Sequence, residues 1–311
     1  MRIAFTKCHG SGNDFALIDA RAVPIDEAAL PAIARALSDR GGPVGSDGIL
    51  ILADAAGADF AMRMFNPDGS EAETCLNGLR CAARAGLAMA GSDAARVQLK
   101  ASDADVARVA PIAPGVVTIR ETVGPADLDV RGWPIAGLDR IVEARVPPLG
   151  SDRRFTAVAM PNPHLVAFVE RVDEAELVAI GRQCEAAPDW LPNRANVSFV
   201  EVRGRDLFVR TFERGVGLTN ACGSAMAAAS FAACLTGRLD YGVPLTVFNA
   251  GGLVRAEVAG DGRVTLSGNA TFEWQGAARI DVATGMATDL VIEQRFEAEV
   301  TAWAALVAAI D

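Results

Sequence analysis

Several residue types are scarce in this chain of 311 residues. Histidine occurs only as His9 and His164, which leaves too few ligands for a three-histidine or cysteine–histidine zinc site. Lysine occurs only as Lys7 and Lys100, so a pyridoxal phosphate enzyme would have only these two residues for its Schiff base. These shortages leave little room for zinc or pyridoxal chemistry, and we expect no metal and no cofactor.

Long apolar runs are also missing, because no stretch reaches the roughly 18 to 20 unbroken apolar residues of a membrane span. Residues 1–10 have a strand-and-turn pattern without the apolar region of a secretory signal, so we expect a cytoplasmic location. The net charge of −10 disfavours nucleic acids and anionic membranes as partners, since both attract basic surfaces. A small-molecule substrate is the partner that remains.

The composition is that of a folded chain with large cores, since 51% of the residues are hydrophobic, and the length predicts about two domains. Apolar spacing predicts helices over residues 25–40, 75–90, 174–184 and 222–235, with strands between them. The same spacing continues through the tail, residues 290–311, which reads as an amphipathic helix. Each half therefore has the order strands, a helix that starts at a cysteine, and strands.

Two cysteines stand out because each opens a helix rich in small residues. Cys75 and Cys222 both follow a polar turn with glycine, and they lie in different halves of the chain. The start of a helix has unpaired N–H groups and a partial positive charge, which stabilise a thiolate and bind anions. The other cysteines, which we expect to be reduced core residues, are Cys8, Cys81, Cys184 and Cys234.

With these motifs the chain resembles the diaminopimelate epimerases, which invert one α-carbon of their substrate without a cofactor. The similarity runs from residue 1 to about residue 280. It rests on segments 9–15, 45–48, 66–72, 75–81, 162–164, 196–197 and 213–224. The resemblance implies an α+β fold of two pseudo-symmetric mixed-sheet domains, each a sheet wrapped around a central helix, with the active site in the cleft between them. It also implies a homodimer.

The expected first domain comprises residues 1–121 and 275–311 and carries Cys75. The second comprises residues 122–274 and carries Cys222. By resemblance these two thiols are the acid and base that act on opposite faces of the α-carbon, so we expect their sulfur atoms to lie close enough to form a disulfide on oxidation. Backbone N–H groups of Leu76, Asn77, Gly78, Gly223 and Ser224 would bind the α-carboxylate.

The second amino-acid head of diaminopimelate needs its own binding groups. The resemblance assigns it to Asn13, Asn66, Asn162, Asn196 and Arg214, and a guanidinium suits a carboxylate because its N–H groups bind both oxygen atoms. Glu213 and His164 are expected to orient the thiols or to bind the substrate amine. The chain departs from the family pattern at Leu76, Pro161 and Ala225, which puts the substrate range and the rate in question more than the reaction type.

Three other functions stay open at this point. One is a racemase or epimerase of another amino acid, of the proline or hydroxyproline type, on the same fold. Arg214 and the asparagines favour a longer substrate, since a proline-type substrate has no distal head to bind. Another is a non-catalytic paralogue, which retention of both cysteines disfavours. The last is an isomerase with a carboxylate base, which Cys75 at the base position disfavours.

Overall fold

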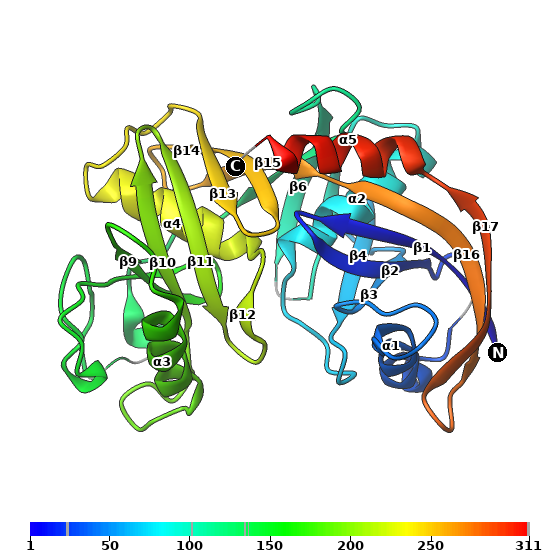
Figure 1. Ribbon diagram of the computed structural model, residues 1–311, viewed down its shortest axis with the longest axis horizontal. Coiled ribbons are helices and arrows are strands. Elements are labelled where there is room, and N and C mark those ends of the chain that lie inside the picture. Colours follow the sequence, from blue (N-terminus) through cyan, green and yellow to red (C-terminus); the bar gives the residue numbers. More distant parts are fainter. Residues whose placement is uncertain (23–24, 101, 134, 136, 310–311) are drawn as a thin grey trace. The chain divides into compact units, whose positions relative to one another are not determined.

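The computed structural model describes residues 1–22, 25–100, 102–133, 135 and 137–309, and these form two compact units (Figure 1). Unit 1 comprises Met1–Glu121 and Ser267–Asp311, and unit 2 comprises Thr122–Leu266. The sequence placed the return to the first domain at residue 275. The structure places it at Ser267, because strand β16 is already paired with β1 from Thr271 onwards.

Unit 1 is a mixed sheet with three α-helices, and its strands lie in the order β17–β16–β1–β2–β3–β4–β5–β6. The strands are β1 Arg2–Gly10, β2 Asn13–Asp19, β3 Ile49–Ala53, β4 Phe60–Phe65, β5 Ala94–Gln98, β6 Asp103–Val109, β16 Thr271–Asp281 and β17 Met286–Arg295. The helices are η1 Glu27–Ala29, α1 Leu30–Ser38, α2 Leu76–Ala90 and α5 Glu297–Ala308.

Unit 2 is a second mixed sheet, with the order β8–β9–β10–β11–β13–β14 and with β12 beside the end of β11. Its strands are β8 Thr156–Ala159, β9 Pro163–Phe168, β10 Asn196–Arg203, β11 Asp206–Glu213, β12 Gly217–Thr219, β13 Leu245–Asn249 and β14 Gly252–Val258. Its helices are η2 Val130–Gly132, η3 Pro147–Leu149, α3 Glu174–Glu185 and α4 Gly223–Leu235. Strands β7 Thr118–Val123 and β15 Val264–Asn269 contain the points where the chain passes between the units.

The two sheets repeat one topology. In unit 1, β2 is parallel to β3, β3 antiparallel to β4, β4 parallel to β5, and β5 antiparallel to β6. In unit 2 the same alternation runs through β9, β10, β11, β13 and β14. Each parallel pair is joined through a crossover that contains a helix, as is usual for parallel strands. Helices α2 and α4 therefore occupy equivalent places, and each begins directly after one of the two predicted catalytic cysteines.

Both faces of the unit 1 sheet are covered by helices, which explains the unbroken apolar run of β3. Ile49 and Ile51 belong to the core under α1, whereas Leu50 contacts the first turn of α2. Successive side chains of a strand point to opposite faces, so a central strand between two helical layers is apolar at every position. The first turn of α2 is therefore packed against β3, a central strand of the sheet.

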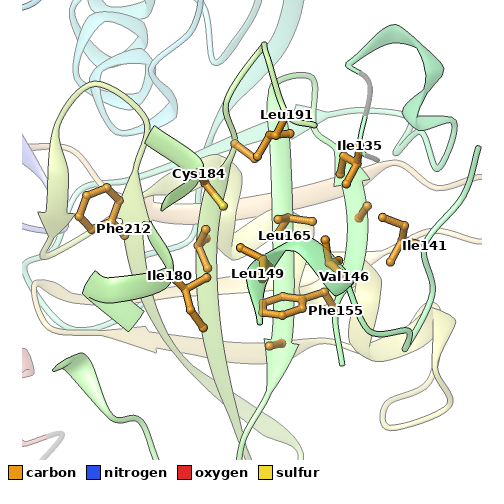
Figure 2. Close-up of a cluster of buried hydrophobic side chains, with 14 of the residues drawn as sticks. Ile135, Ile141, Val146, Leu149, Phe155, Leu165, Ile180, Cys184, Leu191 and Phe212 are labelled. Atoms are coloured by element: carbon orange, nitrogen blue, oxygen red, sulfur yellow. The ribbon is translucent and has the colours of Figure 1, made fainter. Parts of the chain in front are cut away.

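Unit 2 has the same layering. Leu165 of β9 packs with Ile180 and Cys184 of α3 in the buried cluster that Figure 2 shows. His164, the neighbour of Leu165, points to the opposite face and reaches α4. Helix α4 is buried on every side from Gly223 to Cys234, and its alanines and glycine permit this close packing. A helix that is apolar all round is typical of a core position.

The C-terminal tail corrects one prediction. The expected amphipathic helix over residues 290–311 begins only at Glu297, because residues 286–295 form strand β17 against β16. Ile292 fits a helical spacing as well as a strand, and only the neighbouring strand selects between them. The last residues of the predicted helix, 310 and 311, lie outside the described residues. No helix in the described ranges has both the length and the apolar character to cross a membrane.

Candidate active site

Cys75 is the N-cap residue of α2. Its backbone is extended, with φ −150° and ψ 99°, and its Sγ atom accepts a hydrogen bond from the Gly78 N–H at 3.4 Å. The side chain is partly exposed to solvent. A sulfur atom in this position lies beside the partial positive charge of the helix start, and such a charge stabilises a thiolate.

Gly78 is required by the packing of this helix start. A Cβ atom at residue 78 would lie 2.6 Å from Cδ2 of Leu50 and 3.3 Å from Sγ of Cys75. The absence of a side chain lets the first turn of α2 approach β3 and keeps the space beside the sulfur atom clear. The glycine that the sequence assigned to substrate binding therefore has a steric role as well.

Two of the predicted binding residues in unit 1 contact each other. The side-chain amide of Asn77 donates to Oδ1 of Asn13 at 3.4 Å, and Nδ2 of Asn13 donates to Oδ2 of Asp47 at 2.7 Å. Asn66 has a different partner, since its Nδ2 donates to Oγ of Ser70 at 3.0 Å within the turn after β4. The structure thus joins Asn13 and Asn77 by a direct hydrogen bond and places Asn66 in a turn of its own.

A buried polar cluster that the sequence did not predict adjoins Asn77. Arg80 donates to Asn77 and to Glu121, and Asn269 bonds to Ser11 and His9. The only signal in the sequence was an arginine between Leu79 and Cys81 in an otherwise small and apolar helix. Nothing in the sequence relates Glu121 or Asn269 to that helix, because both lie far from it along the chain.

Cys222 is the N-cap residue of α4, with φ −128° and ψ 110°. Its side chain is buried, and burial together with the negative charge of Glu213 raises the pKa of the thiol well above its ordinary value. Its sulfur atom lies 3.5 Å from Oγ of Ser224. Cys222 is therefore a protonated thiol in this environment, unlike a thiol activated at an exposed helix start.

A chain of hydrogen bonds connects Cys222 to other predicted residues of unit 2. Ser224 Oγ lies 3.1 Å from Nε2 of His164, and that nitrogen lies 3.0 Å from Oδ1 of Asn162 and 3.4 Å from Nδ2 of Asn196. The parallel register of β9 and β10 pairs His164 with Asn196 directly. Burial, and then the charge of Arg214, lower the pKa of His164 to about 3, so its ring is neutral.

The hairpin between β11 and β12 holds Glu213 and Arg214. The backbone N–H of Arg214 donates to Oδ1 of Asn196 at 2.7 Å, and its Nη1 donates to the carbonyl oxygen of Asn193 at 3.2 Å. Glu213 accepts a hydrogen bond from the Thr219 hydroxyl across the hairpin. All the residues predicted in unit 2, from Asn162 to Ser224, thus lie on the strands and turns around the start of α4.

The two helix starts share one local design. In each unit the second residue after the cysteine forms a side-chain hydrogen bond to an earlier strand. Asn77 bonds to Asn13 of β2 in unit 1, and Ser224 bonds to His164 of β9 in unit 2. In the described parts of the chain, no group of three or more His, Cys, Asp or Glu side chains is placed to hold a metal ion. The arrangement supplies thiols, N–H groups and amides, which suit proton transfer beside a carboxylate.

The chain is similar in sequence to proteins of one family. A sequence model of the family described as diaminopimelate epimerase matches residues 5–110 and 156–273. A diaminopimelate epimerase of Clostridium acetobutylicum is 35% identical over 289 residues, which cover 90% of this chain and 87% of that protein. The chain belongs to the diaminopimelate epimerase family. One of Ligilactobacillus salivarius is 38% identical over 281 residues, which cover 85% of this chain and 86% of the other.

The fold is shared more widely than the family. A crystal structure of a phenazine biosynthesis protein of the PhzF family from Bacillus anthracis matches with a TM-score of 0.65, covering 90% of this chain and all (100%) of that one. The identity is only 16%, so this likeness concerns the fold alone. It agrees with the predicted α+β class of mixed sheets.

The departures from the pattern of the diaminopimelate epimerase family have local explanations. Leu76 is only 3% exposed, so its side chain is accommodated by the core. Pro161 lies in the turn between β8 and β9, where the hydrogen bond is made by the Met160 N–H to the Asn162 carbonyl at 3.0 Å. This turn therefore does not need the N–H that Pro161 lacks. Ala225 is fully buried within α4 and suits a helix interior.

Proposed function

We propose that this chain interconverts LL- and meso-diaminopimelate without pyridoxal phosphate; the relatives that it matches are named diaminopimelate epimerases. The observation that carries the proposal is the repeated design of the two helix starts. In each unit a cysteine is the N-cap residue of the helix between two parallel strands. These strands are β4 and β5 in unit 1 and the equivalent strands β11 and β13 in unit 2. A reaction that needs one acid and one base on opposite faces of a carbon atom explains why a chain would keep this arrangement twice.

In the proposed reaction, one thiolate removes the α-proton and the opposite thiol protonates the resulting carbanion on its other face. The C–H bond breaks and an S–H bond forms on one side, while the reverse occurs on the other. Cys222, whose pKa is raised, is the acid and Cys75 the base for one of the two epimers, because the configuration of the α-carbon decides which face loses its proton. The roles exchange when the other epimer is the substrate.

The negative charge of the carbanion extends onto the α-carboxylate. We assign its stabilisation to backbone N–H groups in the first turns of α2 and α4, at Leu76, Asn77, Gly78, Gly223 and Ser224. Such groups are fixed before the reaction and bind an anion more strongly as its charge grows. This replaces the electron-withdrawing role that pyridoxal phosphate has in other racemases.

The distal head of the substrate distinguishes diaminopimelate from smaller amino acids. We assign its carboxylate to Arg214, and its polar atoms to the side chains of Asn13, Asn66, Asn162 and Asn196. Glu213 and His164 orient the unit 2 thiol or bind the substrate amine. This set suits a long substrate with two charged ends, which supports diaminopimelate over proline or hydroxyproline. The reaction belongs to lysine and peptidoglycan precursor synthesis, and we propose a cytoplasmic homodimer.

The proposal is tested by incubating the purified protein with LL-diaminopimelate in deuterated water without added cofactor. We expect α-deuterium uptake and formation of the meso isomer. Cys75→Ser and Cys222→Ser should each lower kcat on the order of a hundredfold or more, since a positioned acid or base contributes that much. Cys81→Ala in α2 and Cys234→Ala in α4 are matched controls that remove a buried thiol from the same helices and should retain activity.

The same assay separates the alternatives. Exchange into proline or hydroxyproline, with none into diaminopimelate, would assign the protein to the other racemase class. A folded protein that exchanges no amino acid would be a non-catalytic relative. Full activity of the Cys75→Ser/Cys222→Ser double variant would exclude the two-thiol mechanism.

A further inference from the structure

Arg80 is the largest of the fully buried side chains and lies one turn into α2, the helix that Cys75 caps. A buried guanidinium is costly unless its N–H groups find partners and its charge is compensated. The compensation comes from Glu121, whose side chain is equally buried and whose Oε1 lies 2.8 Å from Nη1 of Arg80. Such a pair is unnecessary for a stable core, since apolar residues of similar volume would serve as well.

The remaining N–H groups of Arg80 bind three separate segments. Nη2 donates to Oδ1 of Asn77 at 2.7 Å and to Oγ of Ser11 at 3.2 Å, and Nε donates to the carbonyl oxygen of Asn269 at 3.1 Å. These segments are the first turn of α2, the turn between β1 and β2, and the end of β15. One planar side chain thus connects the helix start to the turn that precedes Asn13.

This contact decides how the Asn77 amide is oriented. Its Oδ1 faces the guanidinium, and its Nδ2 therefore faces Oδ1 of Asn13 at 3.4 Å. A rotated amide would place its NH2 group against the N–H groups of Arg80, with no acceptor between them. Asn13 presents the matching acceptor, because its own Nδ2 donates to Asp47 at 2.7 Å and leaves its Oδ1 for Asn77.

The turn between β1 and β2 is held equally closely. A Cβ atom on Gly10 would lie 2.6 Å from the Asn77 carbonyl oxygen and 3.0 Å from Nη2 of Arg80. Ser11 has a positive φ of 52°, and its N–H donates to Oδ1 of Asn269 at 2.7 Å. Ser11 and Asn269 thus fix the backbone of the turn while Arg80 fixes the helix start beside it.

We propose that Arg80 is a positioning residue of this enzyme, which orients the Asn77 side chain beside Asn13 and fixes the first turn of α2 for binding the substrate carboxylate. The proposal rests on the proposed function for its effect on the reaction. Arg80 does not touch the substrate. Its effect is exerted through an amide whose direction it sets, and through a helix turn whose N–H groups we assign to the substrate carboxylate.

The test uses Arg80→Lys in the full chain. Lysine keeps the charge beside Glu121, but its ammonium cannot reproduce the planar set of bonds to Asn77, Ser11 and Asn269. We expect kcat to fall roughly tenfold or more with KM changed by less than about threefold, because a transition-state contact is weakened. The matched control is Arg84→Lys, one turn later in α2, where the arginine pairs with Glu299 and donates to the Ala270 carbonyl oxygen.

A second measurement does not depend on activity. Asn77 is only 2% exposed, and the NMR signals of its side-chain amide are assigned by their loss in Asn77→Asp. We expect its protons to exchange with water on the order of ten times faster in Arg80→Lys, and unchanged in Arg84→Lys. If the wild type epimerises no amino acid, the proposed function fails, and faster exchange in Arg80→Lys alone still supports the positioning.

Other results would overturn the proposal. Unchanged kcat and unchanged amide exchange in Arg80→Lys would do so, as would an equal loss of kcat in Arg84→Lys. If Arg80→Lys does not fold, Glu121→Gln replaces it, because glutamine keeps an acceptor for Nη1 and removes the charge that anchors the guanidinium. A Glu121→Gln protein with wild-type kcat and wild-type Asn77 exchange would likewise contradict the proposal.

Discussion

At the scale of single residues, the two predicted catalytic thiols have different surroundings. Cys75 is partly exposed and accepts a hydrogen bond from the helix start, whereas Cys222 is buried beside Glu213 and has a raised pKa. A two-base reaction needs one partner protonated and the other ionised at the start of each turnover. The asymmetry of the two settings is consistent with that requirement, although the topology around them is the same.

His164 gives a prediction about stability and pH. Its pKa is lowered to about 3 by burial, so the folded protein cannot take up the proton that the unfolded chain binds below about pH 6.5. Stability should therefore fall as the pH drops from 6.5 towards 3. His164→Gln removes this contribution, and other groups titrate equally in both proteins.

Urea unfolding of the wild type and of His164→Gln at pH 7.5 and pH 5.0 measures the effect. The wild type should lose about 2 kcal/mol more than the variant between these values, at about 1.4 kcal/mol for each pH unit below 6.5. Equal losses in the two proteins would show that His164 takes up a proton in the folded state, contrary to its buried environment.

At the scale of elements, helix α5 is fastened to α2. Arg84 of α2 pairs with Glu299 of α5, stacks on the Phe272 ring at 3.7 Å and donates to the Ala270 carbonyl oxygen at 2.7 Å. Trp303 of α5 also packs against the His9 ring, with ring centroids 5.9 Å apart. The tail helix thus supports the layer that carries Cys75.

Glu299→Ala should therefore destabilise the protein measurably. The Arg84 and Glu299 side chains are 12% and 20% exposed, so removal of one partner leaves a largely buried charge, and we expect a loss of about 2 kcal/mol in urea unfolding. Asp103→Ala is the control, because its partner Arg96 is 58% exposed and the pair should contribute less than about 1 kcal/mol. Similar losses in both variants would contradict a clamping role for α5.

At the scale of the whole molecule, the repeated topology has one asymmetry. Unit 2 is a continuous stretch of chain, whereas unit 1 needs both ends, because β1 lies between β2 and the C-terminal strand β16. This difference has a consequence for fragments of the protein. Residues 122–266 contain their own sheet and a buried cluster, while residues 1–121 lack β16, one of the two partners of β1.

We expect residues 122–266 alone to fold cooperatively, and residues 1–121 alone to remain largely unfolded or to aggregate through the open edge of β1. Joining 1–121 to 267–311 through a flexible linker should restore folding. Dispersion of backbone NMR signals and a single unfolding transition are the measurements. A folded 1–121 fragment would show that β16 is dispensable for unit 1.

The sequence by itself determined the elements whose signals are local. The extents of α2 and α4, their cysteine N-caps and the family motifs follow from capping, helix propensity and short-range spacing, because these depend on residues a few positions apart. The sequence also indicated most of the residues around the start of α4. The prediction for the tail was wrong where a strand pattern and a helix pattern coincide, because pairing with β16 makes β17 a strand.

Only the tertiary structure decided which distant residues meet. Arg80, Glu121, Asn269 and Ser11 form one buried cluster through contacts between segments up to 258 residues apart in sequence. Likewise, His164 reaches Ser224 because the register of β9 and the position of α4 place them together. Burial and orientation depend on these long-range contacts, so the pKa of Cys222 and the direction of the Asn77 amide are properties of the fold, whereas the presence of two thiols at helix starts is a property of the sequence.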